Sequence, residues 1–400
     1  MRFVKRQFHV GIGLLHQKNC GFMSEIVNEE GDMKITGISI YKTGLPYVGG
    51  TYVWGAGNAI STAMASVVVI DTDTGLQGCG EFTPCGENYM IAHSEGVEAA
   101  ARLLAPKLLG QDPRQVYYLE RLMDRTMQGH GYAKAPFDSA FWDILGQSSG
   151  QPVWMLLGGK LTDGAPMYRV APQKPLDETI TELEAYRASG YRQFQIKVGA
   201  DWQVDIDRIR ETVPLLQPGE KAMADANQGW RVDNAIRVTR ATRDLDFILE
   251  QPCQTYEECQ QVRRIAEQPM KLDECVTGIH MAQRIVADRG AEICCLKISN
   301  LGGLSKARRV RDYLVDNRIA VVAEDTWGGE IASTTLSHFA ASTPAEYLQN
   351  STDLMNYVTR STGIGGAYAK DGLLFAPDSP GLGVKPDFES LGDPVAQWRL

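Results

Sequence analysis

The chain has 400 residues, of which 44% are hydrophobic and 22% are charged, and its formal net charge at pH 7 is -9. This composition is typical of a folded globular protein, and the length predicts one large domain with a smaller partner. Because no basic run could neutralise a row of phosphates, nucleic acid is excluded as a partner.

Neither the cysteines nor the apolar segments indicate a secreted or membrane protein. The eight cysteines show no C-x-x-C spacing, and a chain of this size needs no disulfide framework. No apolar run approaches the roughly 18 residues that cross a bilayer. We therefore expect a cytoplasmic protein with reduced thiols and no membrane partner.

Residues 1–32 differ from the rest of the chain. Residues 1–7 are basic, and a short, mostly apolar stretch at 8–15 follows. No small-residue cleavage site comes after it, so a disordered extension is favoured over an export signal. The folded protein is expected to begin near Met33.

Residues 33–160 carry the pattern of an α+β domain. Strand patterns at 34–41 and 65–70 lie on either side of a glycine-rich loop that contains Tyr52 and Trp54, and a third strand ends near Glu81. Helical spacing follows from about 94 to 147, with an interruption at 129–131. We predict that this region is a separate α+β domain.

Short apolar strands alternate with amphipathic helices from residue 165 onward, which is typical of a parallel sheet or barrel. The fold class is therefore α/β, a (β/α)8 (TIM-like) barrel over residues 161–365 that follows the separate α+β domain. The predicted strands are 166–170, 194–197, 221–225, 247–250, 270–273, 293–297, 319–324 and 346–349.

Five consecutive strands of this set end in an ionisable residue: Lys197, Asp225, Glu250, Asp273 and Lys297. The C-terminal strand ends of such a barrel form one rim, where these enzymes place their chemistry. Three carboxylates in close proximity repel one another unless a cation lies between them. Hard oxygen ligands of this kind select Mg2+. The sequence therefore predicts a magnesium site. For any one of these acids considered alone, a salt bridge at the rim is the alternative interpretation.

The two lysines end the second and the sixth strand, so we expect Lys197 and Lys297 on opposite sides of one pocket. A small molecule bound to the metal would then meet one lysine on each face. An ammonium near a bound metal ion has its neutral form favoured, as a base requires. The pair is predicted to transfer protons, although either lysine alone would be unremarkable.

The sequence resembles the muconate-lactonizing-enzyme subgroup of the enolase superfamily over essentially all of residues 33–400. The resemblance implies a modified (β/α)8 (TIM-like) barrel with an N-terminal α+β capping domain at residues 33–160, to which residues 366–400 return. It also implies that Asp225, Glu250 and Asp273 bind Mg2+, that Lys197 and Lys297 are an acid/base pair, and that the protein is a homo-oligomer. The segments that carry it are Gln-Ile-Lys at 195–197, Asp-Ala-Asn-Gln-Gly-Trp at 225–230, Glu-Gln-Pro at 250–252, Asp-Glu at 273–274, Lys-Ile-Ser-Asn-Leu-Gly-Gly at 297–303 and Pro-Gly-Leu-Gly at 380–383.

One departure concerns the second strand, where the subgroup usually has Lys-x-Lys and this chain has Gln195 in place of the first lysine. A neighbouring cation that lowers the pKa of the base is therefore missing, and Lys197 has to rely more on the metal and on burial. We expect Gln195 and Glu274 to support the ligands and lysines without touching the substrate.

Two further segments, 323–330 and 129–134, resemble the branch that acts on hydroxyproline and proline-betaine compounds, named cis-3-hydroxy-L-proline dehydratases and hydroxyproline-betaine 2-epimerases. Trp327 could hold a ring ammonium by a cation–π contact of about 0.5–2 kcal/mol, or could merely pack under the cap. The predicted substrate contacts are Trp327, Asp325, Tyr52, Trp54 and Asn227.

The predicted reaction is removal of the proton next to a carboxylate, most specifically anti dehydration of cis-3-hydroxy-L-proline to Δ1-pyrroline-2-carboxylate. The alternative is 2-epimerisation of proline betaine or 4-hydroxyproline betaine, and a non-catalytic ligand-binding protein is a third reading. An acid-sugar dehydratase would need a histidine on the seventh strand, which ends here in Glu324 and Asp325. His338, in a helical stretch, is expected to be structural.

Overall fold

The computed structural model describes residues 33–171 and 175–400. Residues 33–400 form one compact unit. The predicted extension at 1–32 lies outside the described residues. Within the described ranges, no helix is long and apolar enough to cross a membrane.

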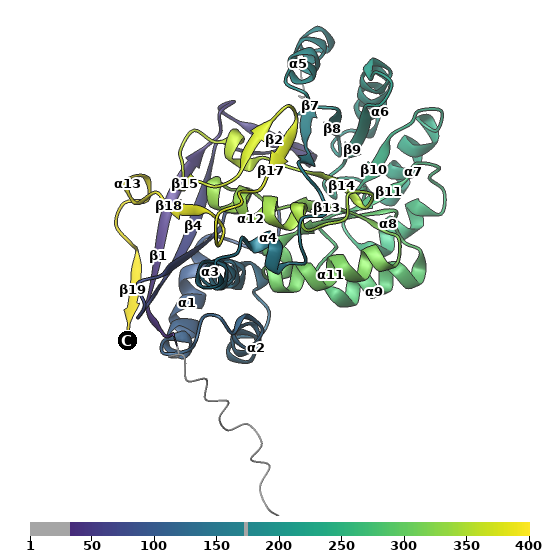
Figure 1. Ribbon diagram of the computed structural model, residues 1–400. Coiled ribbons are helices and arrows are strands. Elements are labelled where there is room, and N and C mark those ends of the chain that lie inside the picture. Colours follow the sequence, from purple (N-terminus) through teal and green to yellow (C-terminus); the bar gives the residue numbers. More distant parts are fainter. Residues whose placement is uncertain (1–32, 172–174) are drawn as a thin grey trace, which may run out of the picture. The chain divides into compact units, whose positions relative to one another are not determined.

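A parallel sheet of eight strands forms a nearly closed barrel, which confirms the predicted fold class (Figure 1). The strand order follows the chain, and an isolated bridge between Met167 and Ser351 links the two edge strands. The strands are β7 (Tyr168–Ala171), β8 (Gln193–Lys197), β9 (Lys221–Asp225), β10 (Ile248–Glu250), β11 (Met270–Leu272), β12 (Ile293–Lys297), β13 (Ala320–Glu324) and β14 (Leu348–Ser351).

The predicted strand bounds agree with these to within two residues. The first predicted strand is divided, because β6 (Ala165–Pro166) pairs with β17 (Leu373–Phe375) and only β7 enters the barrel. Every residue of β8 and β12 is buried, as expected of parallel strands covered on both faces. The apolar runs therefore located the barrel correctly.

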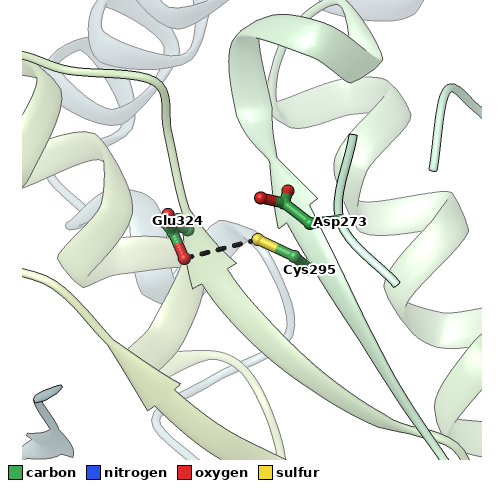
Figure 2. A group of neighbouring side chains, drawn as sticks. All are labelled: Asp273, Cys295 and Glu324. Atoms are coloured by element: carbon green, nitrogen blue, oxygen red, sulfur yellow. Dashed lines mark hydrogen bonds between the residues drawn. The ribbon is translucent and has the colours of Figure 1, made fainter. Parts of the chain in front are cut away.

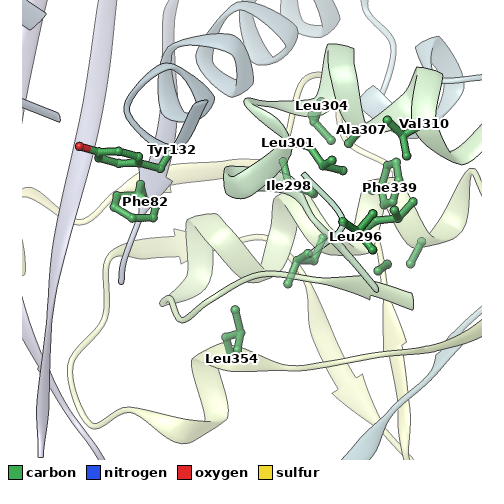
Figure 3. Packing of buried hydrophobic residues seen from close by; sticks show 14 of the residues in the cluster. Phe82, Tyr132, Leu296, Ile298, Leu301, Leu304, Ala307, Val310, Phe339 and Leu354 are labelled. Carbon is green, nitrogen blue, oxygen red and sulfur yellow. The ribbon is translucent and has the colours of Figure 1, made fainter. Parts of the chain in front are cut away.

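Helices follow the barrel strands and pack their apolar faces against them. Leu296 of β12 and Phe339, on a helix that follows β13, belong to one buried hydrophobic cluster (Figure 3). The helices are α5 (Leu176–Ala188), α6 (Trp202–Thr212), α7 (Val232–Ala241), α8 (Tyr256–Arg263), α9 (Ile279–Asp288), α10 (Ile298–Leu301), α11 (Leu304–Asp316) and α12 (Glu330–Ala341).

The N-terminal region is built on an antiparallel sheet in the order β19-β1-β4-β5. Strand β19 (Ala396–Arg399), at the C-terminal end of the chain, pairs with β1 (Ile35–Pro46). The other strands of this sheet are β4 (Thr62–Thr72) and β5 (Gln77–Phe82). The helices of the region are α1 (Glu95–Leu108), α2 (Val116–Thr126) and α3 (Gly131–Ser149).

The predicted interruption at 129–131 coincides with the break before α3, where His130 has a left-handed backbone with φ of 52°. The break between α1 and α2 was not predicted. Helix α3 packs closely on β5, because a side chain at Gly80 would come within 2.0 Å of the Pro136 carbonyl oxygen. This glycine therefore allows the helix to lie directly against the cap sheet.

Short elements complete the described chain. They are β2 (Tyr52–Trp54), η1 (Gly55–Gly57), β3 (Asn58–Ile60), α4 (Val153–Leu156), η2 (Val213–Leu215), η3 (Leu354–Tyr357), β15 (Gly363–Gly365), β16 (Tyr368–Lys370), β18 (Val384–Pro386) and α13 (Phe388–Leu391). Hydrogen bonds join α3 of the cap to the barrel side: Asp138 accepts from the backbone N–H of Ser305 at 2.9 Å and from its hydroxyl at 2.6 Å.

His338 on α12 has a structural environment. Its Nδ1 accepts from the backbone N–H of Trp154 at 3.1 Å, and its Nε2 lies 2.9 Å from the carbonyl oxygen of Leu382. Burial lowers its pKa to about 4. The imidazole is therefore neutral near pH 7 and ties α12 to two other segments.

Candidate active site

Neighbouring barrel strands place charged residues side by side. In the β-sheet register, Lys197 lies opposite Asp225, Asp225 opposite Glu250, and Glu250 opposite Lys271. In the β12–β13 pair, Lys297 lies opposite Glu324. Asp273 directly follows β11. We call these residues, with Glu274, the strand-end cluster: Lys197, Asp225, Glu250, Lys271, Asp273, Glu274, Lys297 and Glu324.

Lys197 is buried, and its ammonium group contacts two side-chain oxygens, one at the end of β9 and one in the loop that follows. Its Nζ lies 2.6 Å from Asp225 Oδ2 and 3.1 Å from Asn227 Oδ1. The Asn227 amide group in turn donates to Glu274 Oε1 at 3.1 Å. The predicted base, one predicted metal ligand, the predicted substrate contact Asn227 and the predicted supporting residue Glu274 are thus connected.

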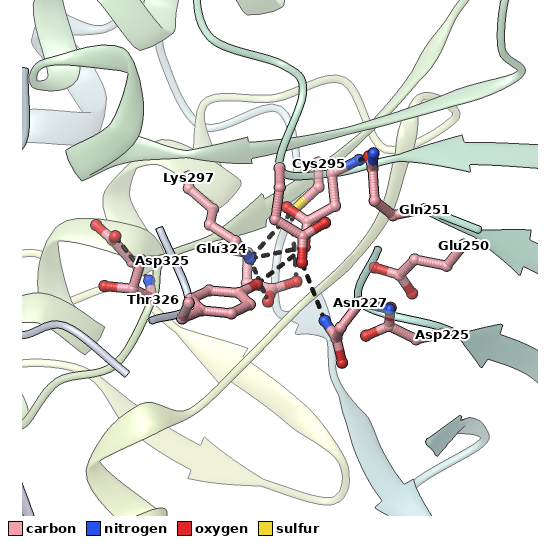
Figure 4. Close-up of polar contacts among 12 residues, drawn as sticks. Asp225, Asn227, Glu250, Gln251, Cys295, Lys297, Glu324, Asp325 and Thr326 are labelled. Atoms are coloured by element: carbon pink, nitrogen blue, oxygen red, sulfur yellow. Dashed lines mark hydrogen bonds and ion pairs between the residues drawn. The ribbon is translucent and has the colours of Figure 1, made fainter. Parts of the chain in front are cut away.

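Lys297 lies between two carboxylates (Figure 4). Its Nζ is 3.0 Å from Asp273 Oδ2 and 3.0 Å from Glu324 Oε1. Tyr89, from the cap loop after β5, donates to the same Asp273 oxygen at 3.2 Å. The Lys297 nitrogen lies 5.5 Å from the centre of the Tyr89 ring.

Glu250 is contacted from two sides. Gln195 Nε2 donates to its Oε2 at 3.0 Å, and Lys271 Nζ lies 2.7 Å from its Oε1. Each of the three predicted metal ligands therefore has its own lysine: Asp225 with Lys197, Glu250 with Lys271, and Asp273 with Lys297.

Burial and the surrounding carboxylates act in opposite directions on the two predicted catalytic lysines. Burial lowers the pKa of each, but Asp225 raises that of Lys197 and Asp273 raises that of Lys297, to values well above the ordinary one. The chain thus favours both ammonium forms. The sequence argument for a neutral lysine considered burial and a metal, but not these pairings.

The carboxylates of the cluster fit a divalent cation. Burial and Asp225 raise the pKa of Glu250 to about 7, and burial with Asp273 raises that of Glu274 well above its ordinary value. Asp273 Oδ1 and Glu274 Oε2 are buried without a hydrogen-bond partner in the described part of the chain. Five carboxylates against three lysines leave two negative charges, and these hard oxygens suit Mg2+.

A different set has its potential ligand atoms within 4.8 Å of one another, namely Asp273, Cys295 and Glu324 (Figure 2). Here Lys297 already supplies a cation to both carboxylates. Burial and Asp273 raise the pKa of the Cys295 thiol well above its ordinary value. The protonated thiol is 3.4 Å from Glu324 Oε2. This set is an ion-pair network and does not fit a hard metal ion.

A cavity of about 40 Å³ lies at the rim under the cap. It is small compared with pockets for drug-sized ligands, which measure roughly 300–1,000 Å³. Lys297, Gln195, Glu274 and the predicted metal ligands do not line it. The lining residues are Tyr52, Trp54, Cys85, Tyr89, Tyr168, Val170, Lys197, Asn227, Glu324, Asp325, Thr326, Trp327, Thr352, Leu354 and Tyr357.

The five predicted substrate contacts all line this cavity. Trp327 packs beneath cap residues as well, with ring centres 5.1 Å from Tyr52 and 5.9 Å from Tyr47. Asp325 accepts from the backbone N–H of Ser299 at 3.0 Å and also from its hydroxyl. Burial raises the pKa of Asp325 to about 6.

Sequence reasoning missed Lys271, Glu324 and Tyr89. Lys271 stands two residues before Asp273, so strand alternation would have placed both on the inward face. Glu324 ends a predicted strand and could have been added to the strand-end residues. Tyr89 carried no signal, because its contact with Asp273 joins residues 184 positions apart.

Comparison with known proteins identifies the family. Residues 178–391 match the enolase C-terminal domain-like family, and residues 54–158 match the mandelate racemase / muconate lactonizing enzyme N-terminal domain. The chain belongs to the enolase superfamily. The resemblance inferred from the strand-end motifs is confirmed, and the protein is an enzyme, either a lyase or an isomerase.

Among curated relatives, a cis-3-hydroxy-L-proline dehydratase from Roseibium aggregatum is 41% identical over 366 residues, covering 92% of this chain and 100% of the relative. An N-succinyl-L-Arg/Lys racemase from Bacillus cereus is 25% identical, covering 90% of this chain and 97% of the relative. The superfamily members thus include both a dehydratase and a racemase that act on small molecules.

Solved structures agree with the fold. A mandelate racemase/muconate lactonizing enzyme from Roseovarius nubinhibens ISM is 78% identical with a TM-score of 0.90, covering 92% of this chain and 99% of that one. An enolase superfamily member from the same organism, complexed with magnesium, is 34% identical with a TM-score of 0.87, covering 92% of this chain and 100% of that one.

Proposed function

We propose that the enzyme is a Mg2+-dependent dehydratase that converts cis-3-hydroxy-L-proline to Δ1-pyrroline-2-carboxylate. The observation that carries the proposal is the pairing of Lys197 and Lys297 with carboxylates on the two sides of the strand-end cluster. The 41% identity to a cis-3-hydroxy-L-proline dehydratase supports the substrate class.

Asp225, Glu250 and Asp273 would hold the metal ion. When bound, the ion would stabilise the negative charge that develops on the substrate carboxylate as C2 loses its proton. Carboxylates that share their charge with a cation stabilise an ammonium less, so a lysine beside Asp225 or Asp273 can then act as a base.

The geometry of the substrate requires two groups. In cis-3-hydroxy-L-proline, the carboxylate and the hydroxyl lie on one face of the ring, so the C2 hydrogen and the hydroxyl lie on opposite faces. One lysine removes the C2 proton, and the other donates a proton to the departing hydroxyl, which leaves as water. The enamine that results tautomerises to the cyclic imine.

The cavity supplies the remaining contacts. The aromatic faces of Tyr52, Trp54 and Trp327 would cover the ring and its ammonium, while Asn227 and Asp325 offer polar atoms.

The second candidate is 2-epimerisation of proline betaine or 4-hydroxyproline betaine. The aromatic wall favours it, because aromatic faces hold quaternary ammonium groups. Return of a proton to C2 by the opposite lysine would use the same machinery. A non-catalytic binding protein is disfavoured, since all five strand-end residues that the reaction needs are present.

The test is incubation with cis-3-hydroxy-L-proline and Mg2+ in D2O, followed by NMR. We expect loss of the substrate signals and appearance of the imine, while enzyme treated with a chelator leaves the substrate unchanged. Proline betaine serves as the parallel substrate, for which deuterium at C2 would reveal epimerisation. If neither compound changes in the presence of folded enzyme, the proposed function is wrong.

A further inference from the structure

The third lysine of the strand-end cluster, Lys271, is completely buried, with 0% of its surface exposed. Its Nζ lies 2.7 Å from Glu250 Oε1, 3.9 Å from Glu324 Oε2 and 5.8 Å from the centre of the Tyr168 ring. It does not line the cavity beneath the cap. Because its charged neighbours are Glu250 and Glu324, we look for a role of Lys271 that acts through these carboxylates.

Lys271 and Gln195 hold the two oxygens of one carboxylate. Gln195 reaches Glu250 Oε2 from β8, and Lys271 reaches Glu250 Oε1 from β11. The two strands stand on either side of the β9–β10 pair, so the cation and the amide approach Glu250 from opposite directions. Exchange of these two side chains would keep one cation and one amide donor on Glu250.

Position 195 is compatible with a cation. The Gln195 side chain is 2% exposed, and its Oε1 has no hydrogen-bond partner within the described residues. A lysine at 195 would remove this unsatisfied acceptor and share the inward face of β8 with Lys197, two residues further on.

We propose that Lys271 is a positioning residue that supplies, from β11, the single positive charge that belongs beside Glu250. This inference rests on the proposed function, which assigns Glu250 to the metal. With no cation there, a buried carboxylate loses its partner. With two cations, the excess of negative charge that attracts Mg2+ falls from two to one.

The test compares wild type with Q195K, K271Q and the exchanged protein Q195K/K271Q. Mg2+ affinity is measured by calorimetry without substrate, and the melting temperature is measured without Mg2+. We expect Q195K to bind Mg2+ at least about tenfold more weakly, and K271Q to melt several degrees lower, because it leaves Glu250 without its ionic partner. The exchanged protein should return to within about threefold of the wild-type affinity and close to its melting temperature.

An exchanged protein that binds Mg2+ as weakly as Q195K, or melts as low as K271Q, would overturn the proposal, and so would a K271Q variant that matches wild type in both measurements. If K271Q does not fold, a folded, Mg2+-binding Q195K/K271Q supports the proposal, and failure of both to fold overturns it. A wild type that binds no Mg2+ refutes the proposed function instead. The melting temperatures of the four proteins then still decide whether one cation belongs beside Glu250.

Discussion

The two predicted catalytic lysines have the same side chain but different surroundings. Lys197 lines the cavity and is bonded to one carboxylate and one amide, Asp225 and Asn227. Lys297 does not line the cavity and lies between two carboxylates, with the Tyr89 ring nearby. The Lys197 side is therefore the less strongly charged of the two.

Under the proposed function, this difference indicates which lysine removes the C2 proton and which donates a proton to the departing hydroxyl. A lysine held by one carboxylate loses more of its stabilisation when that carboxylate is shared with a cation, so we expect Lys197 to be the better base. Lys297 keeps Glu324 as a partner, and burial of this carboxylate is outweighed by Lys297 and Lys271, which lower its pKa to about 2. We expect Lys297 to remain an ammonium and to donate the proton to the departing hydroxyl.

The largest expected effects come from removing either lysine. Lys197→Ala and Lys297→Ala should each lower dehydration by at least about 1,000-fold, because each step of proton transfer loses its group. Exchange of the C2 hydrogen with D2O, followed by NMR, should disappear in Lys197→Ala but persist in Lys297→Ala. Lys221→Ala, at the exposed start of β9, is the matched control.

The reverse pattern, with exchange retained in Lys197→Ala and lost in Lys297→Ala, would interchange the two roles. Equal loss of exchange in both variants would show that both lysines are needed before C2 loses its proton.

The next effect concerns the metal. Asp225→Asn and Asp273→Asn should each weaken Mg2+ binding by about 100-fold, since each removes a charged oxygen ligand. Calorimetry measures the affinity, and a chelator should abolish activity that added Mg2+ restores. Unchanged Mg2+ affinity in both variants would exclude these carboxylates as ligands.

The same comparison shows what the sequence could predict. The barrel strands followed from apolar runs at regular intervals, and Lys197, Asp225, Glu250, Asp273 and Lys297 followed from their places at strand ends. These signals are local, because one strand and its terminal residue are contiguous in the chain. The side chains therefore reach one rim as expected.

The pairing of each acid with its own lysine could not be predicted, since it depends on side-chain conformations across neighbouring strands. Lys271 lies in the middle of the three-residue strand β11 and not at its end, so the strand-end pattern did not include it. The contact of Tyr89 with Asp273 depends on how the cap meets the barrel, which no local pattern encodes. These are also the contacts that make the two lysines different.

Substitution of Tyr89, which lies near Lys297, should have a smaller effect on the rate of dehydration. Tyr89→Phe removes the hydroxyl that donates to Asp273 and should lower the kcat for dehydration by about tenfold, the worth of one hydrogen bond to a charged group. Exchange of the C2 hydrogen, which depends on Lys197, should change little. Tyr118→Phe, on the exposed side of α2, is the matched control from the cap. A larger loss of exchange than of dehydration in Tyr89→Phe would contradict the division of roles.

The smallest effect concerns Asp325, which places a carboxylate on the Lys297 side. On the Lys197 side, the comparable polar residue is the uncharged Asn227. Burial raises the pKa of Asp325 to about 6, above the value near 3.9 of an unfolded chain. Between about pH 4 and pH 6, the native state then holds more protons than the unfolded state, so this group lowers the free energy of unfolding as the pH rises.

Asp325→Asn removes this dependence. The fall in the free energy of unfolding from pH 4 to pH 7, measured by urea denaturation, should be about 1 kcal/mol smaller in the variant than in wild type, below the limit of about 3 kcal/mol set by the difference in pKa. Other titrating groups cancel in this comparison because both proteins contain them. An equal or larger fall in the variant would mean that Asp325 is ionised as readily in the folded protein as in the unfolded chain, and that the Lys297 side carries one more fixed negative charge near neutral pH.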